Sequence, residues 1–125
     1  MVSALITLAS AGKQDCHHWW LAQGGQPQRL AALMAAPLRT TGQPAAQPQE
    51  LIEVFRPLPR GESTGRGPGG EEALYRYRID PRRGGLQLSC WRRYPKGIGW
   101  QRRCGPMPLR LFIQRFNATP PHASS

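Results

Sequence analysis

The stretch ALYRYRID shows the clearest alternation of hydrophobic and polar positions in the chain. Tyr75, Tyr77 and Ile79 occupy every second position, and Arg76 and Arg78 lie between them. Successive side chains of a strand point to opposite faces of a sheet, so this spacing predicts a β-strand with one apolar face and one arginine-bearing face. DPRRGG then predicts a turn, and LQLSCWRRY predicts a second strand.

Two hairpin registers follow from this pattern. With RRGG as the first loop, Tyr77 pairs with Cys90 and the apolar faces of the two strands coincide. The next stretch, CWRRYPKGIGWQRRC, is nearly a palindrome, and folding it about its central glycine places Cys90 opposite Cys104 and Tyr94 opposite Trp100. Aromatic cross-strand pairs contribute roughly 0.2–1 kcal/mol each and help to set the register. The pattern therefore predicts a three-stranded antiparallel meander.

Outside this region the pattern mostly favours helices. Residues 3–21 begin with a helix-like apolar spacing, and residues 26–36 place Pro27 in a first turn before a row of apolar side chains. Residues 108–117 have apolar positions at helical intervals, which favours a short helix over a strand. LIEVF, at 51–55, is rich in β-formers and predicts a fourth strand.

Together these elements predict a single α+β domain, in which short N-terminal helices pack on a three- to four-stranded antiparallel β-meander and a short C-terminal helix follows. The 13 prolines and 14 glycines indicate that much of the chain is loop. The expected parts are an N-terminal helical segment (1–36), a Pro-rich connector (37–50), a basic antiparallel sheet (51–117) with a mobile loop at 57–70, and a frayed tail (118–125).

The positive charge is unevenly distributed, because about one third of the chain holds the whole net charge. Residues 73–116 contain ten arginines and Lys96 against Asp80 alone, which equals the net charge of +10 for the whole chain. Such a concentrated field favours a polyanionic partner. Fifteen of the 17 basic residues are arginine, whose planar guanidinium grips phosphate at two points and stacks on aromatic rings.

The two registers predict where this charge gathers. They place Trp91 between Arg76 and Arg103 on the face opposite the apolar one, with further arginines beside it. Aromatic rings flanked by arginine suit single-stranded nucleic acid, because bases stack on the rings while guanidinium groups hold phosphates. The expected nucleic-acid-binding residues are Arg76, Arg78, Trp91, Arg93 and Arg103. The competing interpretation is that Trp91 packs under the N-terminal helices and the arginines only reach outward to solvent.

We therefore expect a small, basic, non-catalytic binding protein whose partner is RNA or single-stranded DNA. One alternative is an adaptor that docks on an acidic protein surface through the same arginines. A second is an extracytoplasmic protein stapled by a disulfide between Cys90 and Cys104. The pattern leaves the oligomeric state open.

Catalytic and metal sites find little support in the sequence. Cys16, His17 and His18 lie together in DCHHWW, but the spacing matches no zinc motif, and adjacent residues such as Cys16 and His17 do not face each other as a nucleophile and base. No phosphate-binding loop motif is present, and the seven acidic residues are scattered. We expect no enzyme activity, no metal and no cofactor.

The chain begins with the apolar stretch MVSALITLASAG. No Lys or Arg precedes the apolar run, and the run is short for a signal peptide. No stretch approaches the roughly 20 apolar residues that a membrane span needs. We therefore expect these residues to belong to the folded domain, and the protein to be cytoplasmic.

Overall fold

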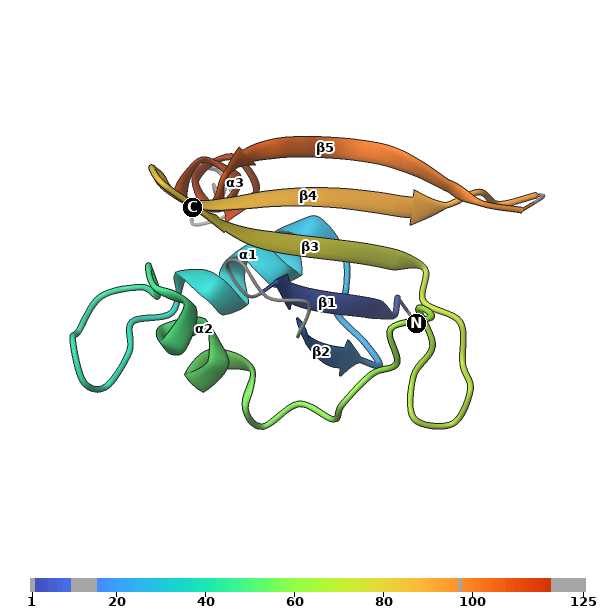
Figure 1. Ribbon diagram of the computed structural model, residues 1–125, viewed down its shortest axis with the longest axis horizontal. Coiled ribbons are helices and arrows are strands. Elements are labelled where there is room, and N and C mark those ends of the chain that lie inside the picture. The colour runs from blue at the N-terminus through green and yellow to red at the C-terminus, as the bar shows by residue number, and fades with distance from the viewer. Residues whose placement is uncertain (1, 10–15, 97, 118–125) are drawn as a thin grey trace, which may run out of the picture.

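The structure, a computed structural model, describes residues 2–9, 16–96 and 98–117. A five-stranded sheet runs through it in the order β2–β1–β3–β4–β5 (Figure 1). The strands are β1 (Ala4–Ala9), β2 (Cys16–Leu21), β3 (Tyr75–Arg82), β4 (Gly85–Arg93) and β5 (Trp100–Pro108). The described helices are α1 (Pro27–Ala35), α2 (Pro48–Phe55) and α3 (Leu109–Asn117). The predicted α+β class is confirmed.

The sheet is larger than predicted and is mixed. β3, β4 and β5 form the expected antiparallel meander, but β1 pairs in parallel with β3, and β2 pairs antiparallel with β1. The expectation of a purely antiparallel sheet of three to four strands is therefore wrong. The two additional strands come from the part of the chain that was expected to be helical.

The N-terminal segment is the main correction, because residues 3–21 form strands where a helix was expected. All six residues of β1 are buried, since the strand lies between β2 and β3 and is covered on both faces. A strand buried on both faces is apolar without alternation, and its sequence resembles that of a buried helix. Within the expected helical segment 1–36, only α1 is a helix among the described residues.

Of the remaining predicted elements, two helices are confirmed and one strand is wrong. α1 begins at Pro27 and buries Leu30, Ala31 and Met34, as its spacing predicts, and α3 confirms the C-terminal helix. LIEVF is not a strand but the greater part of α2. The carboxylate of Glu50 accepts the backbone N–H groups of Ala46 and Gln47, each at 2.9 Å, which fixes the start of this helix inside the expected connector 37–50. The tail 118–125 lies outside the described residues.

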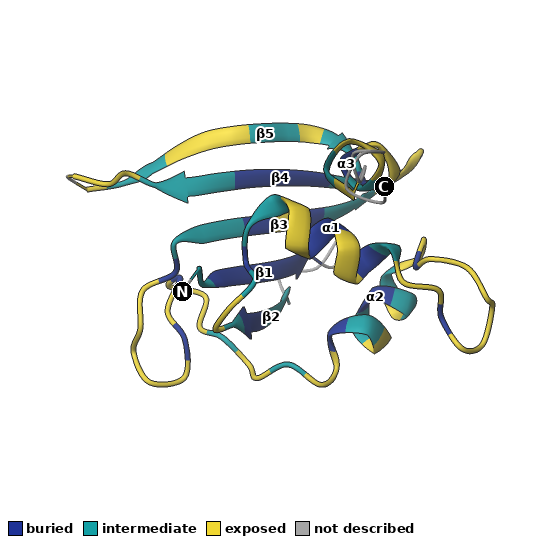
Figure 2. Ribbon diagram, turned by 180° about the vertical axis from the view of Figure 1, so that it is seen from behind, coloured by how far each residue is buried: buried dark blue, intermediate teal, exposed yellow. Residues whose placement is uncertain are grey.

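The helices cover one face of the sheet, which we call the helical face (Figure 2). Buried side chains from α1, α2 and α3 pack there against alternate residues of the strands, among them Ile6, Tyr77, Ile79, Leu88 and Cys90. The Tyr77 hydroxyl donates a hydrogen bond of 2.6 Å to the Gly25 carbonyl, which ties β3 to the segment before α1. The opposite face, which we call the open face, carries Arg76 and Arg78 of β3 and Arg93 of β4, whereas Arg92 lies on the other side, opposite Tyr75.

A loop borders the open face beside β2. The Trp20 N–H donates to the Pro59 carbonyl at 2.8 Å, and the Gly61 N–H donates to the His18 carbonyl at 3.1 Å. Leu5, Trp20 and Ala73 form a small buried cluster on this side of the sheet, and Trp100 packs against it. These contacts do not test the predicted mobility of residues 57–70, which stays a prediction.

The two predicted hairpin registers have different outcomes. The β3–β4 register is confirmed, with Tyr77 opposite Cys90, although the strands continue to a tighter turn than RRGG. In the β4–β5 pair, Cys90 lies opposite Cys104 as predicted, but the register shifts on both sides of this pair. Trp100 consequently lies opposite Arg93, and the predicted pairing with Tyr94 is wrong.

The shift between the Leu88–Met107 and Cys90–Cys104 pairs lies at Gly105. This residue has a φ of +86°, which favours glycine, and any Cβ placed on it would collide with the Leu88 carbonyl of β4. The close approach accompanies an extra residue in β5, a β-bulge. Because side chains alternate with a period of two, each one-residue shift reverses which face a side chain occupies. The second shift, at Arg103 between the Cys90–Cys104 and Trp91–Arg102 pairs, therefore moves Trp100 from the expected helical face to the open face.

We predict that Gly105→Ala destabilises the protein, because the new methyl group meets the Leu88 carbonyl and the backbone conformation disfavours a side chain. The expected loss in the free energy of unfolding is about 2–4 kcal/mol. Gly84→Ala is the matched control, since a Cβ at Gly84 meets no atom within 4 Å. Urea denaturation of both variants measures the difference. Equal stabilities would contradict the role given to Gly105.

Candidate nucleic-acid interface

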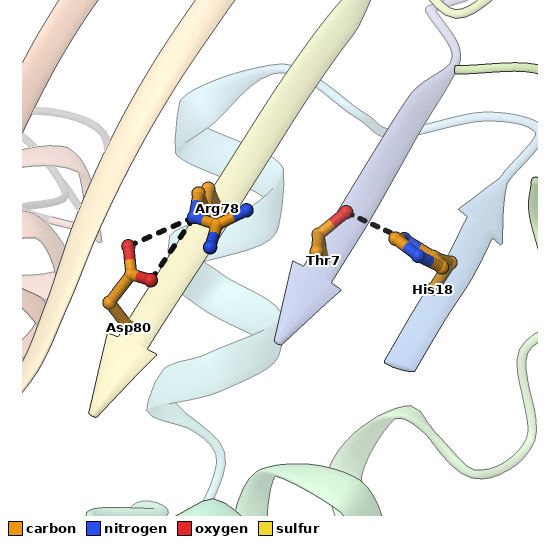
Figure 3. Close-up of polar contacts among 4 residues, drawn as sticks. All are labelled: Thr7, His18, Arg78 and Asp80. Atoms are coloured by element: carbon orange, nitrogen blue, oxygen red, sulfur yellow. Dashed lines mark hydrogen bonds and ion pairs between the residues drawn. The ribbon is translucent and has the colours of Figure 1, made fainter. Parts of the chain in front are cut away.

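The open face presents polar and aromatic side chains from all five strands. β1 and β2 contribute Thr7 and His18, which are directly paired, and β3 contributes Arg76 and Arg78. Figure 3 shows Thr7, His18, Arg78 and Asp80 on these strands, with the helices behind the sheet. β4 and β5 contribute two tryptophans, Trp91 and Trp100.

These side chains line a cavity of about 490 Å³. Its walls include two indoles, two guanidinium groups and the His18 imidazole, and Ser63 lines it from the bordering loop. Both tryptophans are partly exposed, so their rings remain accessible to a ligand. The cavity thus combines flat aromatic surfaces with hydrogen-bond donors that carry positive charge. Its full set of lining residues is Thr7, Cys16, His18, Ser63, Arg76, Tyr77, Arg78, Trp91 and Trp100.

Arg76 is the cation at the centre of this face. Its side chain is partly buried and donates one hydrogen bond, to the Ser63 carbonyl at 3.3 Å. Burial first, and then the charges of Arg93 and Arg78, lower the pKa of its guanidinium. Within the described ranges, Arg76 forms no ion pair with a carboxylate. It is therefore a partly desolvated positive charge that an incoming anion would stabilise.

The neighbouring arginines are already partnered. Arg78 Nε lies 3.1 Å from an oxygen of Asp80, as Figure 3 shows. Arg93 donates from Nε to the Ala73 carbonyl at 3.0 Å, and its Nη1 lies 3.5 Å from the Glu72 carboxylate. These contacts partly balance two guanidinium groups, so of the two arginines that line the cavity, Arg76 is the one without a carboxylate partner among the described residues.

The indoles form the second component of the site. The guanidinium carbon of Arg93 lies 4.7 Å from the centroid of the Trp100 ring, and that of Arg76 lies 5.5 Å from it. Arg102 lies 5.7 Å from the centroid of the Trp91 ring. Cation–π contacts of this kind contribute about 0.5–1 kcal/mol each when exposed. They hold charge and aromatic surface together on one face.

Most of the predicted binding residues come together here. Arg76, Arg78 and Trp91 line the cavity, and Arg93 lies over Trp100 beside it. Arg103 does not join them, because it is the extra residue of the bulge between the Cys90–Cys104 and Trp91–Arg102 pairs. The alternative that Trp91 packs under the N-terminal helices is also wrong, since α1 lies on the opposite face (Figure 2).

Sequence reasoning missed Thr7, His18, Ser63 and Trp100. Thr7 and His18 were missed because their segment was assigned to a helix, and Trp100 because the bulge was not anticipated. Taken as a strand, CHHWWL would have placed Cys16, His18 and Trp20 on one face. His17 does lie on the other face, where its ring stacks on that of Trp19 with centroids 5.5 Å apart. No sequence signal of comparable strength points to Ser63.

His18 lies at the positive end of the cavity. Its Nδ1 is 2.9 Å from the Thr7 hydroxyl oxygen (Figure 3). Burial is the largest cause that lowers the pKa of this imidazole, and the charges of Arg76, Arg78 and His17 lower it further. The neutral imidazole consequently predominates at neutral pH and adds a hydrogen-bonding group without adding to the repulsion among the arginines.

Cys90 and Cys104 face each other across β4 and β5, and both are free cysteines in the structure. A hydrogen bond between the two thiols, followed by burial, raises the pKa of Cys90. The same hydrogen bond lowers the pKa of Cys104. Direct opposition of their Cα atoms is compatible with a disulfide, so the disulfide-stapled alternative stays untested.

The lowered pKa of His18 predicts an effect on stability. In the unfolded chain His18 takes up a proton near pH 6.5, whereas in the folded protein its lowered pKa keeps it neutral there. The contribution of His18 to the free energy of unfolding is therefore present above about pH 6.5 and is lost as the pH falls below it. His18→Gln, which has no titratable group, should lose less stability between about pH 7 and pH 5 than the parent protein. Thermal denaturation across that range measures this, and identical pH profiles would contradict it.

A thiol count tests the predicted disulfide. The chain contains three cysteines, so the unreduced, denatured protein should show three reactive thiols if the pair is reduced and one if it is bridged. Because both cysteines are free in the structure, three thiols are the expected result. A single thiol would favour the disulfide-stapled alternative.

Comparisons with known proteins add no further assignment. No family model, curated protein or solved structure matches the chain. Among the helices that the structure describes, none is long and apolar enough to cross a membrane. No group of three or more His, Cys, Asp or Glu side chains within the described residues is arranged to hold a metal ion.

Proposed function

We propose that the protein is a non-catalytic module that binds single-stranded nucleic acid, RNA or DNA, on the open face of its sheet. The observation that supports this most strongly is the position of Arg76, a partly buried cation with no carboxylate partner among the described residues, in a cavity that two partly exposed indoles also line. Phosphate supplies the missing negative charge, and bases supply flat rings for the indoles.

Phosphate binding rests on the distribution of charge. Residues 73–116, which include β3, β4, β5 and α3, hold the whole net charge of +10. Binding of arginine to phosphate releases counterions from the nucleic acid, so affinity falls as salt rises. We expect Arg76 to contribute most to phosphate binding, because Asp80 and Glu72 already partly balance the charges of Arg78 and Arg93.

Base stacking rests on the spacing of the indoles. Trp100 lies opposite Arg93, two residues along β4 from Trp91, so the two backbone positions are about 7 Å apart along the strand direction. Each ring has an arginine against it, which widens the flat surface available to a base. Single-strand-binding sheets combine such stacking positions with basic side chains along the backbone path.

The competing function is docking on an acidic protein surface. Carboxylates could also neutralise Arg76, but they would make no use of the two partly exposed indoles in the same cavity. The aromatic component therefore favours nucleic acid over an acidic protein. The two functions can be distinguished by how strongly binding depends on Trp91.

We predict that Trp91→Ala weakens binding of a fluorescent single-stranded oligonucleotide by about tenfold or more, because one stacking position is worth about 1–3 kcal/mol. Arg76→Ala should weaken binding less and should reduce the slope of log affinity against log salt by about 0.7, the loss of one phosphate contact. Arg110→Ala is the matched control, since Arg110 is exposed on α3, on the helical face. Fluorescence anisotropy at several salt concentrations measures all three.

The result that contradicts nucleic-acid binding is equally definite. If affinity for the oligonucleotide is the same in Trp91→Ala, Arg76→Ala and Arg110→Ala, the open face is not the binding surface. If a tagged pull-down retains a defined acidic protein after nuclease treatment and no nucleic acid, the adaptor function replaces this proposal.

A further inference from the structure

Among the described residues, the most exposed large hydrophobic side chain lies in the connection between β4 and β5. The hairpin extends beyond the end of β3, so its tip projects away from the sheet (Figure 1). Ile98 is 100% exposed and Tyr94 is 43% exposed. Both side chains belong to the same short connection, so both are available to a partner that meets it.

The charges around this tip identify the kind of surface it meets. No Asp or Glu follows Asp80 in the sequence, so the hairpin carries only positive charge. The basic residues on the tip and the adjoining strand ends are Arg92, Arg93, Lys96, Arg102 and Arg103. An apolar tip surrounded by basic residues complements a flat apolar surface with negative charge at its edges. The end of a duplex is such a surface, because its terminal base pair is flanked by phosphates.

The tip is also continuous with the open face. A groove of about 530 Å³ has Ile98, Gly99 and Trp100 in one wall. Its other lining residues include Arg66 and Arg93, together with Glu62 and Glu72, of which Glu72 pairs with Arg93. A single strand that stacks on Trp100 therefore leads directly toward Ile98.

We propose that the tip formed by Tyr94 and Ile98 contacts the end of a duplex at the point where the bound single strand enters it. The preferred ligand is then a junction between single-stranded and double-stranded nucleic acid. Apolar side chains such as isoleucine act in this way in proteins that wedge between base steps. This inference rests on the proposed function, because it assumes that single strand occupies the open face.

Fluorescence anisotropy with matched probes tests the preference. The probes are one labelled single strand, the same strand with a duplex at its 5′ end or at its 3′ end, and a blunt duplex. The parent protein should bind a junction of one polarity about tenfold more tightly than the single strand, as expected for burial of one isoleucine side chain. Ile98→Asp should lower junction affinity to the single-strand value and leave single-strand affinity within about twofold.

Ile98→Leu is the matched control, because it keeps an apolar side chain and should keep the junction preference. Ile98 is fully exposed, so neither substitution disturbs the core. Equal affinity of the parent protein for junction and single strand overturns this inference and leaves the proposed function standing. Absence of binding to every probe overturns both.

A membrane surface is the other partner that a basic apolar tip suits, and the same variants address it. The proposal would be overturned, and the tip assigned to membranes, by two results together. The parent protein would co-sediment with vesicles of anionic lipid and Ile98→Asp would not, while Ile98→Asp kept the junction preference. Loss of the junction preference in Ile98→Asp, without binding of the parent protein to vesicles, supports it.

Discussion

The pairing of β5 with β4 determines which side chains of β5 reach each face of the sheet. The register shifts on both sides of the Cys90–Cys104 pair: Gly105 closely approaches the Leu88 carbonyl on one side, and Arg103 is the extra residue on the other. The shift at Arg103 places Trp100 opposite Arg93, on the open face. Without it, Trp100 would lie on the helical face and Arg92 would lie beside Arg102. One extra residue in β5 thus separates a sheet that places Trp100 among the arginines of the open face from one that pairs two arginines directly.

The two faces of the sheet have opposite physical character for a common reason. Period-two alternation in β3 and β4 places tyrosine, isoleucine, leucine and cysteine under the helices, and arginine, serine and tryptophan on the other side. The helical face supplies stability through burial, and the rigid strands hold the open-face side chains in fixed relative positions. Arg76 can therefore remain partly desolvated beside Arg78 and Arg93, a repulsive arrangement that flexible loops would relax. Binding of an anion converts this repulsion into attraction.

Much of the meander was predictable, because local alternation and turn residues determine it. The β3–β4 register, the Cys90–Cys104 pair, α1 and α3 all follow from spacing along the chain. The N-terminal strands were not predictable in the same way, since β1 is buried on both faces and its apolar run shows no strand period. LIEVF lies in the helix α2 despite its β-propensity. The helix is stabilised because Glu50 caps its first turn and because Leu51 and Phe55 are buried. The extra residue at Arg103 appears only in the pairing of β5 with β4, which no local pattern records, and Trp100 was missed for that reason.

The four tryptophans provide the most direct test of the central claim, that nucleic acid binds on the open face. Trp91 and Trp100 line the cavity there, whereas Trp19 is buried on the helical face against Phe55. The measurement is the titration of ¹⁵N-labelled protein with a single-stranded oligonucleotide, followed through the indole N–H signals by nuclear magnetic resonance. The account predicts large shifts of the Trp91 and Trp100 signals and little change at Trp19. Shifts confined to Trp19, or saturable binding that leaves Trp91 and Trp100 unmoved, would contradict it.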